Sequence, residues 1–336
     1  GQPHQHKTEK RFTGRKNIPQ IESNIINLTK MIRTETMDSP IFHIGHHKTA
    51  TSWLQDYYFS MHPDINVISD YREPWKDPFL KYLIASSERK FSVRRCQKIF
   101  EKQLITVHQP ETKTVVSAER LSGAPFSGGY DSFILAERIH ACFPNARIIM
   151  AIRNQSTMIR SLYKQQIREG YIGLFSDFVY TAHSWSGTVF SLDMLEYDLL
   201  INKYLDLFST RNLLVLVYED FIRDPAVFLN NISDFLGIST FESPDTGRKI
   251  NKGRNDSKTK RKRLLNHFRK SDMNPFPVIS LSEGSRRKLY RALSPLYALS
   301  KKELITAADL EYIKNYYREP NKRLRSLLQR ELPDYP

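Results

Sequence analysis

The sequence predicts an α/β protein in which helices flank a central parallel sheet. Short apolar runs of strand length, such as residues 41–44 and 147–152, alternate along the chain with segments of helical periodicity. Because parallel strands need crossover connections, which are usually helices, this alternation indicates a parallel sheet. With 336 residues, 40% of them hydrophobic, the chain can build one sizeable core. No internal repeat or clean boundary divides residues 39–330, so we expect a single domain there.

Residues 1–38 are polar, basic and mostly aperiodic, which predicts a flexible tail with one short helix near residues 21–32. The tail lacks the apolar segment of a signal peptide, and no apolar run reaches the roughly 18 residues of a membrane span. Two cysteines, Cys96 and Cys142, cannot form a disulfide framework. These features favour a cytoplasmic protein without a transmembrane segment, and leave open a leader or anchor that has been removed.

The elements after residue 40 follow from their periodicity and their stop signals. We expect strands at residues 41–44, 65–69, 113–118, 147–152 and 213–217. We expect helices, with apolar residues spaced three and four apart, from residue 52 and at residues 79–104, 131–143, 157–169 and 228–236. In open parallel sheets, ligands bind beyond the carboxyl ends of the strands. The polar residues that follow strands are therefore the first candidates for a site, namely Lys48, Glu119, Arg153 and Tyr218.

The loop after the first strand has the composition of an anion-binding loop. A strand–loop–helix unit directs free backbone N–H groups and the positive end of a helix dipole at one point. Lys48 adds a full charge there, and Thr49, Thr51 and Ser52 add hydrogen-bond donors. The ordinary nucleoside-triphosphate loop, G-x-x-x-x-G-K-[ST], is not matched, because His47 precedes the lysine.

A second anion site is predicted at the end of the strand at 147–152. Arg153 follows this strand directly, and Ser161 comes eight residues later within a helix. This spacing brings a guanidinium and a hydroxyl near one face. A planar, permanently charged fork beside a hydroxyl suits a phosphate dianion.

Both loops resemble those of the sulfotransferases. The 5′-phosphosulfate loop of that family has a form close to P-K-[ST]-G-T-[TS]-W. In this sequence His47 replaces the Pro and Ala50 replaces the Gly, while the matching positions are Lys48, Thr49, Thr51, Ser52 and Trp53. The 3′-phosphate site of the family is an Arg-Asn-Pro strand end with a Ser eight positions after the Arg. Arg153, Asn154 and Ser161 match that pattern, and Gln155 replaces the Pro.

Three further segments resemble the same family. Tyr218-Glu219-Asp220 is similar to its Y-E-D segment, where the tyrosine lies near the adenine. Residues 312–324 look like the closing segment of the heparan-sulfate and related bacterial enzymes. A late R-K-G-x-x-G segment is matched only in part, by Lys252, Gly253 and Arg254. The resemblance spans about residues 40–325 and is closer to the carbohydrate-type and bacterial members than to the cytosolic ones.

The resemblance implies a P-loop-like sulfotransferase fold and the donor 3′-phosphoadenosine 5′-phosphosulfate (PAPS), which leaves as PAP. It implies transfer of the sulfuryl group to a hydroxyl or amine, with no metal required and Lys48 stabilising the leaving phosphate. A hydroxyl is a poor nucleophile and needs a base. We choose Glu119, which ends the strand between the two loops, and expect burial to raise its pKa toward neutrality. His46 and His47 are rival bases.

The net charge of +15, from 51 basic and 36 acidic residues, indicates an anionic partner. Residues 248–270 alone hold eleven Lys and Arg against Asp256. This run suits an acidic acceptor such as an anionic glycan, and residues 70–79 and 171–190 are candidate acceptor walls. Two other functions stay open. A nucleotide kinase would use Asp220 as a metal ligand. A nucleic-acid-binding protein would use the basic run, although residues 248–266 contain no aromatic side chain.

Overall fold

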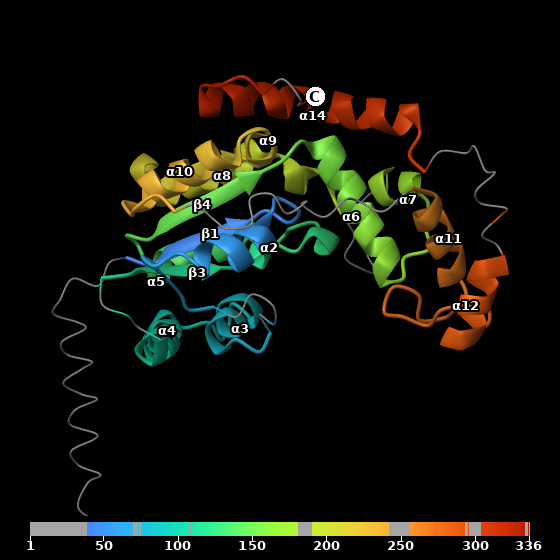
Figure 1. Ribbon diagram of the computed structural model, residues 1–336, viewed down its shortest axis with the longest axis horizontal. Coiled ribbons are helices and arrows are strands. Elements are labelled where there is room, and N and C mark those ends of the chain that lie inside the picture. The colour runs from blue at the N-terminus through green and yellow to red at the C-terminus, as the bar shows by residue number, and fades with distance from the viewer. Residues whose placement is uncertain are drawn as a thin grey trace, which may run out of the picture. The chain divides into compact units, whose positions relative to one another are not determined.

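Five parallel strands form a single sheet in the order β2-β3-β1-β4-β5 (Figure 1). The strands are β1 Ile41–Gly45, β2 Ile65–Val67, β3 Lys113–Ser117, β4 Arg147–Ile152 and β5 Leu213–Val217. The central strand β1 pairs with β3 on one side and with β4 on the other. The carboxyl ends of these three strands therefore meet at one edge, and the predicted α/β class with a parallel sheet is confirmed.

The computed structural model describes residues 39–69, 73, 75–107, 109, 111–180, 190–241, 256–292, 295, 304–332 and 335. The predicted helix near residues 21–32 lies outside these residues. So do three residues carried over from the family, Lys252, Gly253 and Arg254. None of the helices within the described ranges is both long enough and apolar enough to cross a membrane.

Helices cover both faces of the sheet, and this explains the continuous apolar runs in the strands. Ile41 and Ile149 face a core shared with the helices that follow β1 and β5. Phe42 and Ile148 face the other, larger core. The helices are α2 Thr51–Trp53, α3 Pro78–Ala85, α4 Val93–Val107, α5 Ser132–Cys142, α6 Gln155–Glu169, α7 Phe175–Tyr180, α8 Tyr197–Leu207, α9 Tyr218–Arg223, α10 Pro225–Leu236, α11 Asp256–Asn266, α12 Glu283–Ala292 and α14 Ala307–Leu328.

Two predicted helices differ from expectation. The helix after the first loop begins as α2 and continues as a π-helix over Leu54–Phe59, with one extra residue per turn. Four side chains of this π-helix are buried, Leu54, Gln55, Tyr58 and Phe59. The single periodic segment predicted at residues 79–104 is two helices, α3 and α4, which pack against each other through Phe79 and Phe100.

The long C-terminal helix α14 lies along α8 and also contacts α6 and α7 (Figure 1). Arg323 binds Asp198 and Glu196 at the start of α8, and Arg330 beyond the helix binds Asp220 in α9. Inside the core, the amide of Asn321 pairs with Gln155, the first residue of α6, at 2.8 Å. Gln155 occupies the position where the sulfotransferase pattern has proline. Its side chain connects the loop after β4 to helix α14.

Candidate active site

The loop between β1 and α2 has an unusual backbone. Lys48 and Ala50 both adopt left-handed conformations, with φ of 62° and 63°. Alternating left- and right-handed residues turn successive N–H groups toward one point, which forms an anion-binding concavity. The first N–H groups of α2 add to it, because a helix has no internal acceptors for them. The position of Ala50 explains why related loops carry glycine there, since glycine adopts this φ without steric cost.

Threonine hydroxyls brace the loop from inside. Thr49 Oγ1 and Thr51 Oγ1 both donate to the carbonyl oxygen of His46, at 2.6 and 3.0 Å, and both side chains are buried. Ser52 is exposed on the helix. Trp53 is packed against Phe221 in the core, with ring centroids 4.9 Å apart. Thr49, Thr51 and Trp53 therefore stabilise the loop from inside, whereas Ser52 faces solvent.

Arg153 connects the two predicted anion loops. Its Nη1 donates to the carbonyl oxygen of Lys48 at 2.9 Å, and its Nε donates to Thr157 Oγ1 at 3.0 Å. The guanidinium carbon lies 4.5 Å from the ring centroid of Tyr218, which follows β5. The structure therefore brings Lys48, Arg153 and Tyr218 together, from the ends of three strands.

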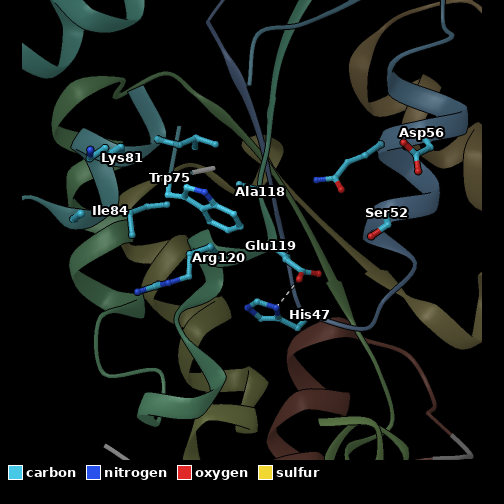
Figure 2. Close-up of a pocket in the computed structure, with 12 residues that line it drawn as sticks. His47, Ser52, Asp56, Trp75, Lys81, Ile84, Ala118, Glu119 and Arg120 are labelled. Carbon is cyan, nitrogen blue, oxygen red and sulfur yellow. Dashed lines mark ion pairs between the residues drawn. The ribbon is translucent and has the colours of Figure 1, made fainter. Parts of the chain in front are cut away.

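Glu119 lies beside the same loop and pairs with His47. The distance between His47 Nδ1 and Glu119 Oε1 is 2.9 Å, and His47 Nε2 lies 3.3 Å from the carbonyl oxygen of Gly123 (Figure 2). This close approach depends on Gly45, whose φ is 88°. A Cβ at this position would lie 3.0 Å from the Cα of Glu119. Arg120, the next residue in the chain, binds Asp131 instead of Glu119.

The expected rise in the pKa of Glu119 is wrong. Burial raises this pKa, but the neighbouring His47 and Lys48 together outweigh burial and hold it below its ordinary value of 4.5. A carboxyl of this kind is ionised throughout the neutral range. Its side chain is 38% exposed, so a ligand can reach it.

Lys48 is a half-buried cation. Burial lowers the pKa of its ammonium group below 10.5, Glu119 partly opposes this shift, and Arg168 and Arg153 lower the pKa further. Among the residues that the structure describes, no carboxylate forms an ion pair with Lys48. A desolvated cation of this kind is stabilised by a bound anion.

The other two histidines of the first strand and loop, His43 and His46, are buried. His43 Nδ1 bonds Ser117 Oγ at 2.7 Å, and burial lowers its pKa to about 4. Burial also lowers the pKa of His46 to about 3, and its ring packs against Tyr197. Both are neutral at physiological pH, and His46 is 1% exposed. Of the two rival bases, His47 is the one that forms an ion pair with Glu119 among the described residues.

Ser161 lies one and a half turns into α6 and lines a small basic cavity of about 60 Å³. Lys164 and Arg168 of the same helix contribute to it, together with Lys258 and Lys262 of α11. Helix α11 is part of the basic run, and it is held on α6 by ion pairs from Arg160 and Lys164 to Asp256 and by a bond from Arg263 to Tyr163. The sequence did not link α11 to Ser161, because the contact exists only between elements distant in the chain.

A cavity of about 780 Å³ opens beside Glu119, and we call it the Trp75 cavity (Figure 2). Figure 2 shows Trp75, Ile84 and Lys81 on one side and Ser52 and Asp56 on the other. Its lining residues are His47, Ser52, Gln55, Asp56, Trp75, Leu80, Lys81, Ile84, Ala85, Ala118, Glu119 and Arg120. Of the predicted acceptor walls, the segment at 70–79 contributes Trp75; in the segment at 171–190, residues 181–189 lie outside the described residues.

Sequence reasoning missed Gln55 and the α3 side of this cavity. Gln55 Nε2 donates to Ser117 Oγ at 2.9 Å, which ties the π-helix to the end of β3, two residues before Glu119. Gln55 is only 4% exposed, and a buried amide needs such a bond, but the sequence alone does not identify the partner.

Comparison with known proteins identifies the family. The model of the sulfotransferase family matches residues 40–243, more than half of the chain. No protein with a curated description matches the sequence significantly. The matched region includes both anion loops, Glu119 and Tyr218.

Solved sulfotransferase structures are similar to this chain. The sulfotransferase from Alicyclobacillus acidocaldarius is 19% identical with a TM-score of 0.54, over 88% of this chain and 98% of that one. The sulfotransferase domain from the curacin biosynthetic pathway is 14% identical with a TM-score of 0.41, over 88% and 99%. A mouse sulfotransferase complexed with PAP is 14% identical with a TM-score of 0.37, over 84% and 85%. The first likeness supports the same fold, and with the family match it confirms the sequence-based identification: the chain belongs to the sulfotransferase family.

Proposed function

We propose that this sulfotransferase moves the sulfuryl group of PAPS to a hydroxyl or amine of an acceptor. One observation carries the proposal. The loop of Lys48 and the strand end of Arg153 are joined by a hydrogen bond, and Glu119 lies at the adjacent strand end. Two anion-binding groups and a carboxylate base thus share the carboxyl edge of the sheet.

The residues at this edge fit a nucleotide that carries phosphate groups at two positions. We assign the 5′-phosphosulfate to the loop of residues 47–53, through backbone N–H groups, Lys48 and Ser52. We assign the 3′-phosphate to Arg153 and Ser161, with Lys258 and Lys262 of α11 nearby. Tyr218, stacked on Arg153, is the candidate wall for the adenine. The chemistry that PAPS supplies when bound is an activated sulfuryl group.

The protein contributes charge stabilisation and proton transfer. The Lys48 ammonium is placed to stabilise negative charge on the leaving phosphate, because it is partly desolvated and has no carboxylate of its own among the described residues. Glu119 is ionised at neutral pH and can accept the proton of the acceptor group. His47 holds the Glu119 carboxylate from the loop side, so the loop and the base keep a fixed spacing.

The resemblance implies a hydroxyl or amine as the acceptor group, and the basic run suits a carbohydrate, including an anionic glycan, as one acceptor class. Helix α11 holds part of the basic run, and two of its cations are engaged, Arg263 with Tyr163 of α6 and Arg261 with Tyr290 of α12, so these two are not available to a polyanion.

Both rival functions lose support. Arg330 binds both carboxylate oxygens of Asp220, at 2.7 and 3.1 Å, so the candidate metal ligand of a kinase is already engaged. In the basic run, Arg261 stacks on Tyr290 and Arg263 bonds Tyr163, which reduces the cationic surface open to a nucleic acid.

The test is an acceptor screen with the purified chain and radiolabelled PAPS, in EDTA and in excess Mg²⁺, alongside calorimetric titration with PAP. We expect PAP binding and label transfer without added metal. Label transfer from ATP but not from PAPS would establish a phosphoryl transferase instead. Binding of RNA that persists in Lys48→Ala, with no PAP binding, would support the nucleic-acid alternative.

A further inference from the structure

A cluster of large apolar side chains is exposed in the segment that joins α11 to α12. Phe276 is 91% exposed, Val278 78%, Ile279 60% and Met273 40%. Single exposed apolar residues are common, but four of them within seven positions indicate an interaction surface. We call residues 273–279 the apolar loop.

The backbone of the apolar loop is held in place, so the exposure of its side chains does not result from loose packing. The side chain of Asn274 is buried and donates to the carbonyl oxygens of Asn266 and Arg269, at 2.8 and 3.2 Å. The N–H of Val278 donates to the carbonyl oxygen of His267 at 3.1 Å. Helix α11 in turn packs on α6 (Figure 1). The loop is thus fixed to the end of α11 with its apolar side chains in water.

Cationic side chains lie on both sides of the apolar loop in the sequence. Residues 269–292 hold six of them against two carboxylates, and the six are Arg269, Lys270, Arg286, Arg287, Lys288 and Arg291. Helix α12 packs on α11, where the ring centroid of Tyr290 lies 4.6 Å from the guanidinium carbon of Arg261. Arg287, Lys288 and Arg291 share the exposed face of α12. The apolar loop is therefore bordered by positive charge.

We propose that the apolar loop and the cations beside it dock onto the surface of an anionic lipid membrane. Binding to such a surface strengthens with the apolar area that enters the boundary between headgroups and acyl chains, and with electrostatic attraction to anionic lipids. Phe276, Val278 and Ile279 supply the apolar area. The cations supply the attraction, and each Lys or Arg near the headgroups strengthens binding roughly fivefold.

Other occupants fit only half of this surface. A nucleic acid or an acidic polysaccharide would pair with the cations but would leave Phe276, Val278 and Ile279 in water. A second copy of the chain, docked through the same face, would bring positive charge against positive charge. An anionic bilayer offers an apolar layer and negative headgroups together, so it matches both parts of the surface.

Sedimentation of the full chain with lipid vesicles tests the proposal without any catalytic readout. The vesicles contain phosphatidylcholine, with or without phosphatidylglycerol. At low salt we expect binding to the anionic vesicles to be at least roughly tenfold tighter than to the neutral ones, and salt should reduce this difference because it screens the charges. Equal binding to both kinds of vesicle, or no binding to the anionic ones, overturns the proposal.

The variant Phe276→Trp reports whether the loop enters the bilayer. Relative to the unsubstituted chain, its added fluorescence should shift to shorter wavelength on anionic vesicles and should be quenched by lipids that are brominated in the acyl chains. Ile222→Trp is the matched control, because Ile222 is an exposed apolar residue of α9. The same signal in both variants, or in neither, overturns the proposal.

The apolar and charged parts can be removed separately. Combining Phe276→Ser, Val278→Ser and Ile279→Ser should weaken binding to anionic vesicles at least roughly tenfold, because less apolar area leaves water. These side chains are exposed, so thermal unfolding should not change. Unaltered vesicle binding in this triple variant overturns the role of the loop. A dimer that light scattering detects in the unsubstituted chain, and that the triple variant loses, would assign the surface to a second copy instead.

Removal of charge is tested on α12. Lys288→Ala with Arg291→Ala should weaken binding to anionic vesicles roughly thirtyfold and should leave the weak binding to neutral vesicles unchanged. Arg94→Ala with Lys98→Ala is the matched control, since both cations are exposed on α4. Equal losses in the two double variants overturn the proposal. Tight binding of single-stranded RNA that the α12 variant loses, with no vesicle binding by the unsubstituted chain, would assign the cations to a nucleic acid.

Discussion

Arg153 donates a hydrogen bond of 2.9 Å to the carbonyl oxygen of Lys48, across 105 positions of sequence. Arg153 directly follows β4, and Lys48 lies in the loop after β1, which is the neighbour of β4 in the sheet. This bond makes the two candidate phosphate sites one structural unit. A change at either residue should therefore affect both ends of the bound nucleotide.

The variant Arg153→Ala tests that unit. It removes the bond to Lys48, the stacking on Tyr218 and a charge toward the 3′-phosphate, so we expect the Kd of PAP to rise at least roughly tenfold, as loss of a charge-assisted bond implies. Calorimetry measures this directly. Arg147→Ala is the control, because Arg147 begins the same strand and also stacks on an aromatic ring, Phe235, but at the opposite edge of the sheet. Similar losses in both variants would contradict the assignment.

Removing the Lys48 ammonium should affect both binding and chemistry. Lys48→Ala is expected to abolish label transfer from PAPS and to weaken PAP binding, because the partly desolvated cation is lost from the anion loop. Lys90→Ala, an exposed lysine far from this loop in sequence, provides the control for general charge. Normal turnover in Lys48→Ala would rule out its role at the leaving phosphate.

Glu119→Gln should separate base catalysis from donor binding. The amide keeps the size of the side chain but cannot accept the proton, so kcat should fall by about 10²–10⁴, the usual contribution of a general base. The Kd of PAP should change little. Glu111→Gln, just before the other end of β3, is the matched control. Near-normal kcat in Glu119→Gln would transfer the role of base to another group, with His47 the first candidate.

The pH profile of kcat/KM should reflect two lowered pKa values in the free enzyme. Burial lowers the pKa of Lys48 below 10.5, so activity should decline on the alkaline side before an ordinary lysine would lose its proton. The pKa of Glu119 is below 4.5, so the acidic decline due to this residue should lie below that pH. In Lys48→Arg, the residual activity should persist to higher pH, because arginine stays protonated. An alkaline decline that is identical in Lys48→Arg would exclude Lys48 as its source.

Gly45→Ala should impair activity more than stability. At φ of 88° an alanine is strained, and its Cβ would press on the Cα of Glu119. Gly237→Ala isolates the backbone strain, since Gly237 has φ of 65° and nothing within 4 Å of an added Cβ. We expect both variants to lose about 1 kcal/mol of stability in urea unfolding. Gly45→Ala alone should lose activity, roughly tenfold or more, because small displacements of catalytic groups are costly.

Local sequence was sufficient for the strands and for the individual chemical groups of the site. Residues 147–152 and 213–217 form strands within the predicted bounds, because continuous apolar runs are buried on both faces of a parallel sheet. Lys48, Glu119, Arg153 and Tyr218 could be selected because each follows a strand, and strand ends of a parallel sheet meet at one edge. The family identification rested on the spacing within two short loops.

Tertiary structure decided how those groups act on one another. The pairing of His47 with Glu119 and the resulting fall in the pKa of that carboxyl depend on contacts across 72 positions of chain, which periodicity does not encode. The π-helix after the first loop also depends on tertiary packing, and periodicity does not predict its extra residue per turn. The Trp75 cavity is the clearest case. Its walls come from α2, the π-helix, α3 and the end of β3, and only folding brings these elements together around Glu119.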